Sequence, residues 1–152
     1  MSVARRAWLR AGALGLLVIA LDQGAKAAIE ANLVPGEHLR ALGPLELTLA
    51  HNSGVAFGLA SGGGIALVAL TLAALVFVVA LFAREPGRPW MWVAVGLLAG
   101  GALGNLIDRV RADAVTDFVD VLSWPPFNLA DVAITLGIVV LALSYMRGTG
   151  ER

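Results

Sequence analysis

The sequence predicts an all-α integral membrane protein with four transmembrane helices and a small extracytoplasmic β-sheet between the first and second helices. Of its 152 residues, 59% are hydrophobic and only 14% are charged, whereas soluble domains carry about 25% charged residues. Four apolar runs are each long enough to cross a hydrocarbon core of about 30 Å. The chain is too short for more than one domain, so residues 1–152 are expected to form a single unit.

The first predicted helix covers about residues 8–29 and contains two charged residues, Asp22 and Lys26. Their spacing of four places them on one helix face, where they neutralise each other. They form either a plain ion pair near the helix end or a support for a nearby site. A basic start followed by an apolar run also resembles a signal peptide, but the internal charges and the further spans favour a retained helix.

The other helices are predicted at about residues 65–83, 90–108 and 127–146. The third of the four runs carries small residues at intervals of four, namely Gly96, Gly100 and Gly104, with Gly101 beside them. Such spacing lets membrane helices approach closely, and no βαβ pattern surrounds it that would indicate a dinucleotide loop. We therefore interpret these glycines as packing residues.

The first outer loop, about residues 30–64, contains the stretch LELTLAHNSGVAFGLA. Leu45, Leu47 and Leu49 alternate with polar residues, which predicts a strand. The Asn-Ser-Gly that follows is typical of a turn, and another apolar stretch comes after it. A small sheet at the outer membrane surface is therefore expected. The second outer loop covers about residues 109–126.

The orientation follows from the arginines that lie beside the chain termini and in the short loop at 84–89, which are Arg5, Arg6, Arg10, Arg84, Arg88, Arg147 and Arg152. Basic residues near the ends of membrane spans face the cytoplasm, so both termini are expected there. All eleven acidic residues except Glu85 and Glu151 lie toward the opposite face. The candidate chemistry is therefore expected on the outer side.

Several functional classes are excluded by composition. The formal net charge is zero, so no electrostatic footprint for nucleic acid exists, and the absence of cysteine excludes disulfides and thiol catalysis. The two histidines, His38 and His51, lack the helical spacing of a metal site, so no metal and no cofactor are expected. No serine has a His–Asp pairing, and a Ser–Lys dyad would need the single lysine, Lys26.

What remains is a group of carboxylates at the outer surface. Asp117 and Asp120 lie in the apolar stretch AVTDFVDVL, and spacing alone does not choose between them. Asp131 falls at the third position of a helix that Asn128 can cap, so it either completes a capping box or does chemistry there as well. Two close carboxyls share one proton, which is the basis of aspartic protease chemistry.

Asn105, Asp108 and Arg109 end the third helix. They are interpreted either as the plain end of a span or as a polar cluster that braces something nearby, because Asn105 lies one turn inside the membrane. A third possibility is a relay of Asp22, Asp108 and Asp131 in a small ion- or proton-coupled carrier. Four short helices without broken segments in two matching halves argue against that alternative.

Five blocks of the sequence, LDQGAK, HNSGVAFG, GGALGNLIDR, VTDF and FNLADVAI, resemble bacterial lipoprotein signal peptidase (signal peptidase II) in order and position, over nearly the whole chain. The resemblance implies a metal-free aspartic endopeptidase of the bacterial cytoplasmic membrane. Its implied partners are membrane lipid and diacylglyceryl prolipoproteins, which it cleaves just before the lipidated cysteine. We also expect a monomer.

The same resemblance implies that Asp117 and Asp131 form the catalytic pair. Because a helix N-terminus favours a negative charge, we expect Asp131 to be the more readily ionised of the two and Asp117 to hold the proton. Other positions that match the family, expected to bind substrate or support the site, are Asp22, Asn52, Gly54, Ala56, Gly101, Asn105, Asp108, Arg109, Val115, Phe127, Asn128 and Ala130. Thr116 departs from the family pattern, which has an apolar residue before the first aspartate.

Overall fold

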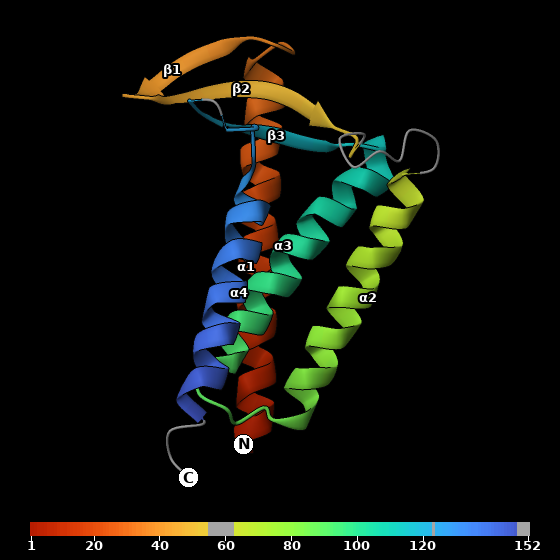
Figure 1. Ribbon diagram of the computed structural model, residues 1–152, viewed down its shortest axis with the longest axis vertical. Coiled ribbons are helices and arrows are strands. Elements are labelled where there is room, and N and C mark those ends of the chain that lie inside the picture. The colour runs from red at the N-terminus through yellow and green to blue at the C-terminus, as the bar shows by residue number, and fades with distance from the viewer. Residues whose placement is uncertain (55–62, 123, 149–152) are drawn as a thin grey trace.

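The computed structural model describes residues 1–54, 63–122 and 124–148. Within them, a bundle of long helices carries a small sheet at one end (Figure 1). The helices are α1 (Val3–Asn32), α2 (Gly63–Arg84), α3 (Met91–Ala112) and α4 (Leu129–Gly148). All four are long and apolar enough to cross a membrane, which confirms the predicted helical architecture.

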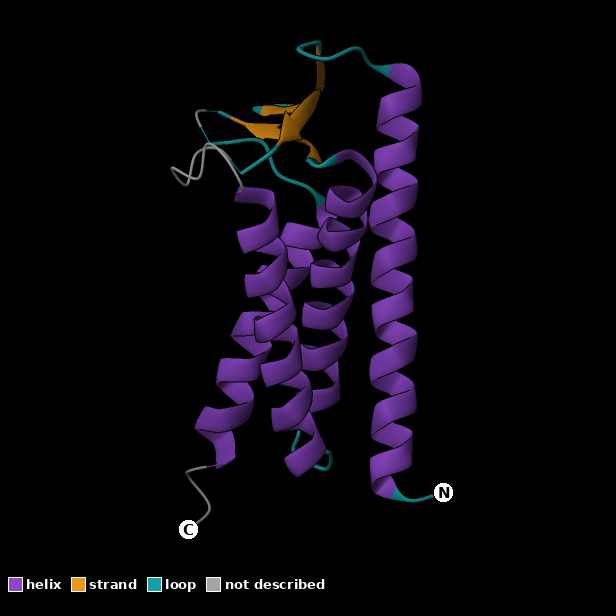
Figure 2. Cartoon of the chain, turned by 90° about the vertical axis from the view of Figure 1, so that its right-hand side faces the viewer, coloured by secondary structure: helices purple, strands orange, loops and turns teal. Residues whose placement is uncertain are grey.

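Helix α1 is longer than expected at both ends. It begins at Val3 because Ser2 caps it, with the Ser2 side chain accepting a hydrogen bond from the Arg5 backbone N–H at 3.2 Å. Its 30 residues span about 45 Å, which exceeds the thickness of the hydrocarbon core. Figure 2 shows the consequence, since α1 continues past the ends of the other helices and stands beside the sheet.

Helix α3 lies at the centre of the bundle and packs against α1 on one side and α4 on the other. On the α1 side, a Cβ added to Gly100 would lie 2.8 Å from the Gly15 carbonyl oxygen. On the α4 side, a Cβ added to Gly101 would lie 2.5 Å from the Ala130 carbonyl oxygen. The prediction that these glycines allow close helix packing is confirmed, and they serve two neighbouring helices at once.

Helix α2 packs mainly on α3 and leaves most of its side chains exposed. Leu70, Val76 and Phe77 are each more than 60% exposed. An apolar surface of this kind suits a lipid environment, where no water has to be ordered around it. Among the described residues, α2 is therefore the helix whose side chains are expected to face lipid most extensively.

The sheet contains β1 (His38–Leu42), β2 (Leu45–Asn52) and β3 (Val115–Val121), antiparallel and in that order. Strands β1 and β2 form the expected sheet between α1 and α2. The predicted small sheet is confirmed, and strand β3 extends it from the second outer loop, to which the prediction had assigned no element. Its first four residues are all buried, so they form a run without the alternation of a half-exposed strand. The second apolar stretch of the first loop, residues 55–60, lies outside the described residues.

The N-terminus and the C-terminal end of α4 lie at the end of the bundle opposite the sheet (Figure 1). The turn between α2 and α3 is at this end, where Arg88 pairs with Glu85 at 2.6 Å and lies over the Tyr145 ring at 4.2 Å. Phe82 and Met91 are fully buried here. Aromatic and basic side chains gathered at this end are typical of a membrane–water interface. The sheet end of the bundle therefore contains the C-termini of α1 and α3 and the N-termini of α2 and α4.

Candidate active site

The N-terminus of α4 is closed by a reciprocal pair of hydrogen bonds between Asn128 and Asp131. The Asp131 backbone N–H donates to Oδ1 of Asn128 at 3.0 Å, and the Asn128 backbone N–H donates to Oδ2 of Asp131 at 3.3 Å. This is a capping box with aspartate at the third position. The predicted cap is confirmed, and it fixes the Asp131 carboxylate at the first turn of the helix.

The side chain of Asn128 also holds the second aspartate. Its Nδ2 donates to Oδ1 of Asp117 at 2.7 Å and to the Thr116 carbonyl oxygen at 3.3 Å. Asn128 is fully buried, so these bonds lie in a region without competing water. The arrangement brings Asp117 of β3 and Asp131 of α4 to one asparagine, whereas Asp120 is not part of this network.

Asp117 is a buried carboxyl, with only 3% of its surface exposed. Its other oxygen, Oδ2, accepts a hydrogen bond from Nδ2 of Asn52 at 3.1 Å. Burial raises the pKa of Asp117 to about 6, and the charge of Asp131 acts in the same direction, while the hydrogen bonds from Asn52 and Asn128 lower it. Asp117 can therefore hold a proton at a pH where ordinary carboxyls are ionised.

Asp131 is held by Asn105, which projects from α3. Nδ2 of Asn105 donates to Oδ1 of Asp131 at 2.8 Å. The amide oxygen of Asn105 in turn accepts hydrogen bonds from Nδ2 of Asn128 and Nζ of Lys26, both at 3.1 Å. The sequence left open whether Asn105 marks a helix end or braces a neighbour, and the structure shows that it braces Asp131.

Lys26 links the site to a buried ion cluster. Its Nζ lies 2.7 Å from Oδ2 of Asp22 and 2.6 Å from Oδ2 of Asp108. The other oxygen of Asp22 accepts a hydrogen bond from the Ala130 backbone N–H at 2.9 Å, at the first turn of α4. The Asp22–Lys26 pair expected from their spacing is therefore present, and it supports the helix that carries Asp131.

Gln23 was absent from the expected site residues, whereas Lys26 was expected only as an ion pair with Asp22 or as a support for a nearby site. The side-chain amide of Gln23 donates to Oδ1 of Asp108 at 2.8 Å and to the Gly104 carbonyl oxygen at 3.3 Å. Both residues belong to the LDQGAK block, where Lys26 is four residues after Asp22 and three after Gln23, so it neighbours each of them on the helix surface. That spacing was the available signal for their joint role.

Thr116 precedes Asp117 where the family pattern has an apolar residue. Its hydroxyl donates to Oε1 of Glu30 at 2.7 Å, and its backbone N–H donates to Oδ2 of Asp108 at 3.4 Å. The buried hydroxyl is thus satisfied, so the departure from the pattern leaves no unpaired polar group at this residue.

The remaining expected site residues lie on the segments around the two aspartates. Val115 is buried and pairs with Asn52 in the β2–β3 register, and the Gly54 N–H donates to Oδ1 of Asn52 at 2.9 Å. The backbone of Phe127 exchanges hydrogen bonds of 2.8 and 3.0 Å with Val119, which ties the start of α4 to β3. Gly101 and Ala130 meet where α3 contacts α4. Ala56 lies outside the described residues.

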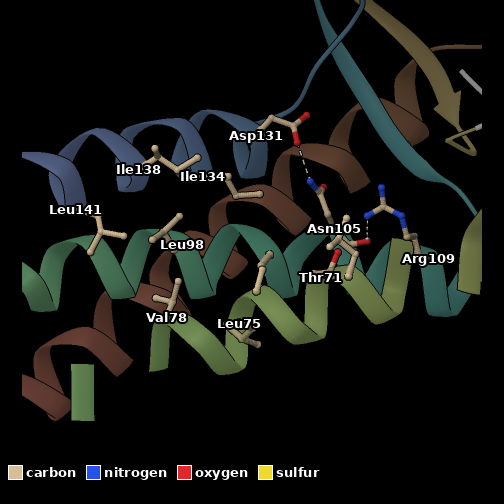
Figure 3. A pocket seen from close by; sticks show the side chains of 13 residues that line it. Thr71, Leu75, Val78, Leu98, Asn105, Arg109, Asp131, Ile134, Ile138 and Leu141 are labelled. Atoms are coloured by element: carbon tan, nitrogen blue, oxygen red, sulfur yellow. Dashed lines mark hydrogen bonds between the residues drawn. The ribbon is translucent and has the colours of Figure 1, made fainter. Parts of the chain in front are cut away.

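An apolar cavity of about 430 Å³ leads from the middle of the bundle to Asp131. It lies between α2, α3 and α4, and its part away from the sheet is lined by residues such as Leu75, Val78 and Leu98. Asn105, Arg109 and Asp131 lie at the end nearer the sheet, toward the right in Figure 3. Nη1 of Arg109 donates to the Asn105 carbonyl oxygen at 3.3 Å, so the guanidinium is held at this end. The cavity has room for an apolar chain whose polar end reaches the aspartate.

The comparison with protein families agrees with this geometry. A family model described as signal peptidase (SPase) II matches residues 14–147. The lipoprotein signal peptidase of Moorella thermoacetica is 43% identical over 141 residues, covering 91% of this chain and 94% of the relative. That of Pelotomaculum thermopropionicum is 41% identical over 137 residues, covering 89% and 90%.

A solved structure is similar over the same extent. A bacterial membrane enzyme determined by the in meso method at 1.9 Å resolution superposes with a TM-score of 0.83 at 30% identity, covering 89% of this chain and 91% of that chain. The similarity in sequence and in fold therefore extends over the helices and the sheet together. The chain belongs to the signal peptidase II family, and it is a multi-pass membrane peptidase that removes signal peptides from lipoproteins.

Proposed function

We propose that Asp117 and Asp131 are the catalytic pair of an aspartic endopeptidase that cleaves diacylglyceryl prolipoproteins just before the lipidated cysteine. The proposal rests on the contacts of Asn128. Its side chain donates to Oδ1 of Asp117 at 2.7 Å, and it caps α4 together with Asp131. One buried side chain thus orients two carboxyls from different elements. Oriented acid and base groups supply general acid–base catalysis.

In the reaction that we infer, Asp131 is the base and Asp117 the acid. Asp131 is half-buried and accepts a proton from a water molecule, whose oxygen attacks the carbonyl carbon of the scissile peptide bond. Asp117, whose pKa is raised to about 6, gives its proton to the carbonyl oxygen. The resulting diol collapses when the proton on Asp131 passes to the amide nitrogen and the C–N bond breaks, and a diol proton returns to Asp117.

The substrate class follows from the cavity below Asp131. Nine of its thirteen lining residues are apolar and its volume is about 430 Å³, which suits an acyl chain or the apolar side chains of a signal peptide. A lipid-modified cysteine is anchored at the membrane surface by its acyl chains, so its peptide bond is held at a fixed depth. Positioning of this kind lowers the entropic barrier to reaction.

We infer the membrane orientation from the charges. Arginines gather at the end of the bundle that holds both termini, so that end is cytoplasmic and the two aspartates face the extracytoplasmic side. Both aspartates come from one chain, so the enzyme acts as a monomer in this proposal. No metal ion takes part in the cleavage.

The carrier alternative receives no support from the contacts. Of the three acids of its relay, Asp22 and Asp108 are both bound to Lys26 at 2.7 and 2.6 Å. A carboxylate neutralised by a buried lysine is poorly suited to release and rebind an ion. These contacts favour a fixed support for the α4 helix.

The test is cleavage of a diacylglyceryl prolipoprotein by the purified protein in detergent, with the unmodified prolipoprotein as second substrate and mass spectrometry of the products. We expect cleavage of the modified substrate only, just before its lipidated cysteine. Asp117→Asn and Asp131→Asn should each abolish cleavage, while Asp120→Asn, a matched change on the same strand as Asp117, should retain it. Full activity in either of the first two variants, or a cut elsewhere, would overturn the assignment. Loss of cleavage in chelator would contradict the metal-free mechanism.

A further inference from the structure

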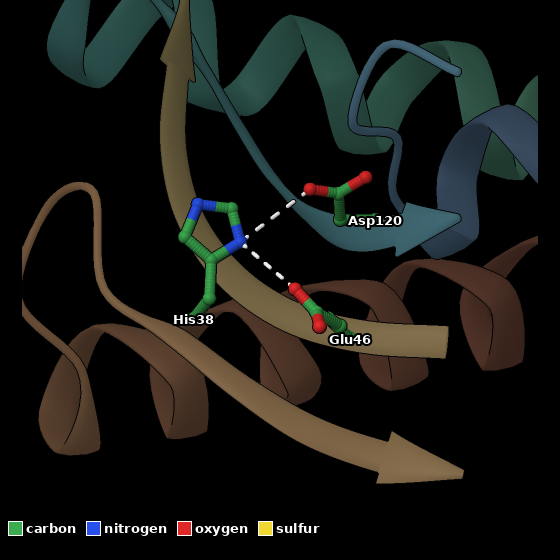
Figure 4. Close-up of side chains that lie close together, drawn as sticks. All are labelled: His38, Glu46 and Asp120. Atoms are coloured by element: carbon green, nitrogen blue, oxygen red, sulfur yellow. Dashed lines mark ion pairs between the residues drawn. The ribbon is translucent and has the colours of Figure 1, made fainter. Parts of the chain in front are cut away.

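A second group of ionisable side chains lies on the sheet, away from the two aspartates. His38 of β1, Glu46 of β2 and Asp120 of β3 converge, one from each strand (Figure 4). Nδ1 of His38 lies 3.4 Å from Oε2 of Glu46 and 3.5 Å from Oδ2 of Asp120. The three candidate ligand atoms all lie within 4.8 Å of one another.

The two separations from His38 match the distance between neighbouring ligand atoms around a bound metal ion. Hydrogen bonds from N–H to oxygen are typically about 2.9–3.0 Å long, so the two contacts of His38 are longer than a well-formed hydrogen bond. Tetrahedral Zn²⁺ with bonds of about 2.0–2.1 Å places its ligand atoms about 3.4 Å apart. The two separations from His38 are therefore close to the spacing that a shared metal ion requires, and the two carboxylate oxygens lie within 4.8 Å of each other.

The charges in the cluster favour a cation at its centre. Glu46 and Asp120 are direct partners in the β2–β3 register, and like charges directly opposite each other destabilise a sheet. His38 contributes at most one positive charge against the two carboxylates. Arg40 is the register partner of Glu46 on β1, but among the described residues the structure shows no ion pair between them. The cluster thus keeps a net negative charge even when His38 is protonated.

We propose that His38, Glu46 and Asp120 bind one divalent transition-metal ion, with Zn²⁺ as the ion that best suits the ligands. Imidazole favours zinc over magnesium and calcium, which prefer all-oxygen sites, and the carboxylates are common zinc ligands. Three protein ligands leave the fourth position to water. The Asp120 side chain is 18% exposed and that of His38 49%, so an ion reaches the cluster from solvent.

The ion would connect all three strands of the sheet. Strand β3 carries both Asp120 and Asp117, so a link from β1 and β2 to β3 restrains the strand that holds the proposed catalytic acid. The ion takes no part in the cleavage chemistry. It stabilises the folded sheet, because a ligand that binds the folded form alone shifts the unfolding equilibrium by mass action.

The experiment measures Zn²⁺ binding to the full chain, purified in detergent without a polyhistidine tag, by calorimetry and by competition with a chromophoric chelator. Co²⁺ serves as a second probe through its visible absorption. We expect one ion per chain and a rise in the thermal midpoint on addition of Zn²⁺. His38→Gln, Glu46→Gln and Asp120→Asn should each weaken binding by more than about 10-fold.

His51→Gln is the matched control, because it changes the other histidine of the chain and lies on β2 outside the cluster. It should bind Zn²⁺ as the parent protein does. The proposal fails if the parent protein binds no Zn²⁺ or if the three cluster variants bind it unchanged. Equal loss in His51→Gln, or competition by Ca²⁺ at the same concentration as Zn²⁺, would also contradict it. A melting curve of each variant in chelator separates lost binding from lost folding.

Discussion

Nδ2 of Asn128 lies 2.7 Å from Oδ1 of Asp117, and the same asparagine caps the helix whose first turn carries the other aspartate, Asp131. The two aspartates come from a strand and from a helix. Backbone hydrogen bonds between Phe127 and Val119 tie the start of that helix to the strand, and Asn128 adds a direct contact to each aspartate. The geometry of the pair therefore depends in part on one fully buried residue.

The first prediction concerns Asn128 itself. Asn128→Ala should lower kcat by about 100-fold, because a displacement of about 1 Å in a catalytic group has an effect of this size. KM should change little, since Asn128 lies outside the lining of the apolar cavity. Kinetics with the diacylglyceryl substrate checks both values. Asn32→Ala is the matched control, because the amide of Asn32 only bonds the Ala28 carbonyl at the end of α1. An equal fall in kcat in that variant would show a general loss of folding.

The second prediction concerns pH. The pKa of Asp117 is about 6 in the folded protein, against 3.8 for an unperturbed aspartate, so the folded form holds a proton that the unfolded chain has released. The wild type should therefore lose stability relative to Asp117→Asn as the pH rises from about 4 to 6, and the difference should be constant above that range. Thermal midpoints of both proteins across this range test the sign. Any constant offset caused by the substitution does not affect the pH-dependent part.

A second variant sharpens the same test. The charge of Asp131 is one cause of the raised pKa of Asp117. In an Asp131→Asn background the pKa of Asp117 should fall, so the pH-dependent effect of Asp117→Asn on the thermal midpoint should shrink. An effect that is independent of pH in both backgrounds would contradict the assignment of the proton to Asp117.

The sequence predicted the features that depend on local spacing. The cap of Asn128 and Asp131, the pairing of Asp22 with Lys26 and the close packing at Gly100 all follow from the 3.6-residue helical period, and the structure has each of them. The β1–β2 part of the sheet was visible because its leucines alternate. The catalytic roles of the aspartates stay predictions.

Features formed by distant segments were not accessible in this way. Strand β3 is buried at its start, and its burial does not alternate. Spacing alone therefore could not show that Asp117 contacts Asn128 whereas Asp120 contacts His38. The side chain of Asn128 contacts Asp117, which is 11 residues earlier in the sequence. His38 on β1 contacts Asp120 on β3, with β2 between these two strands. Such contacts depend on strand register, which a single sequence specifies only through its buried face.

The third prediction concerns the buried ion cluster. Lys26→Met should destabilise the protein by about 3–5 kcal/mol, because it leaves Asp22 and Asp108 buried without a positive partner. Adding Asp22→Asn and Asp108→Asn to this variant should recover much of the lost stability. Unfolding in detergent by SDS titration, followed by circular dichroism, measures the change. If the triple variant is less stable than Lys26→Met alone, the cost does not arise from uncompensated charge.

The last prediction separates helix packing from chemistry. A Cβ at Gly101 would lie 2.5 Å from the Ala130 carbonyl oxygen and 2.8 Å from Cγ1 of Ile134, so Gly101→Ala forces α4 away from α3 at the turn that carries Asp131. Overpacking of this kind costs about 1–3 kcal/mol, and the shift should lower kcat by about 100-fold because it lengthens the 2.8 Å bond from Asn105 to Asp131. Gly12→Ala on α1 is the control, since a Cβ there meets nothing within 4 Å and alanine is the better helix former. It should leave kcat unchanged and raise the thermal midpoint slightly. If Gly101→Ala melts at a lower temperature but keeps full kcat, the spacing of α3 and α4 at this turn does not set the position of Asp131.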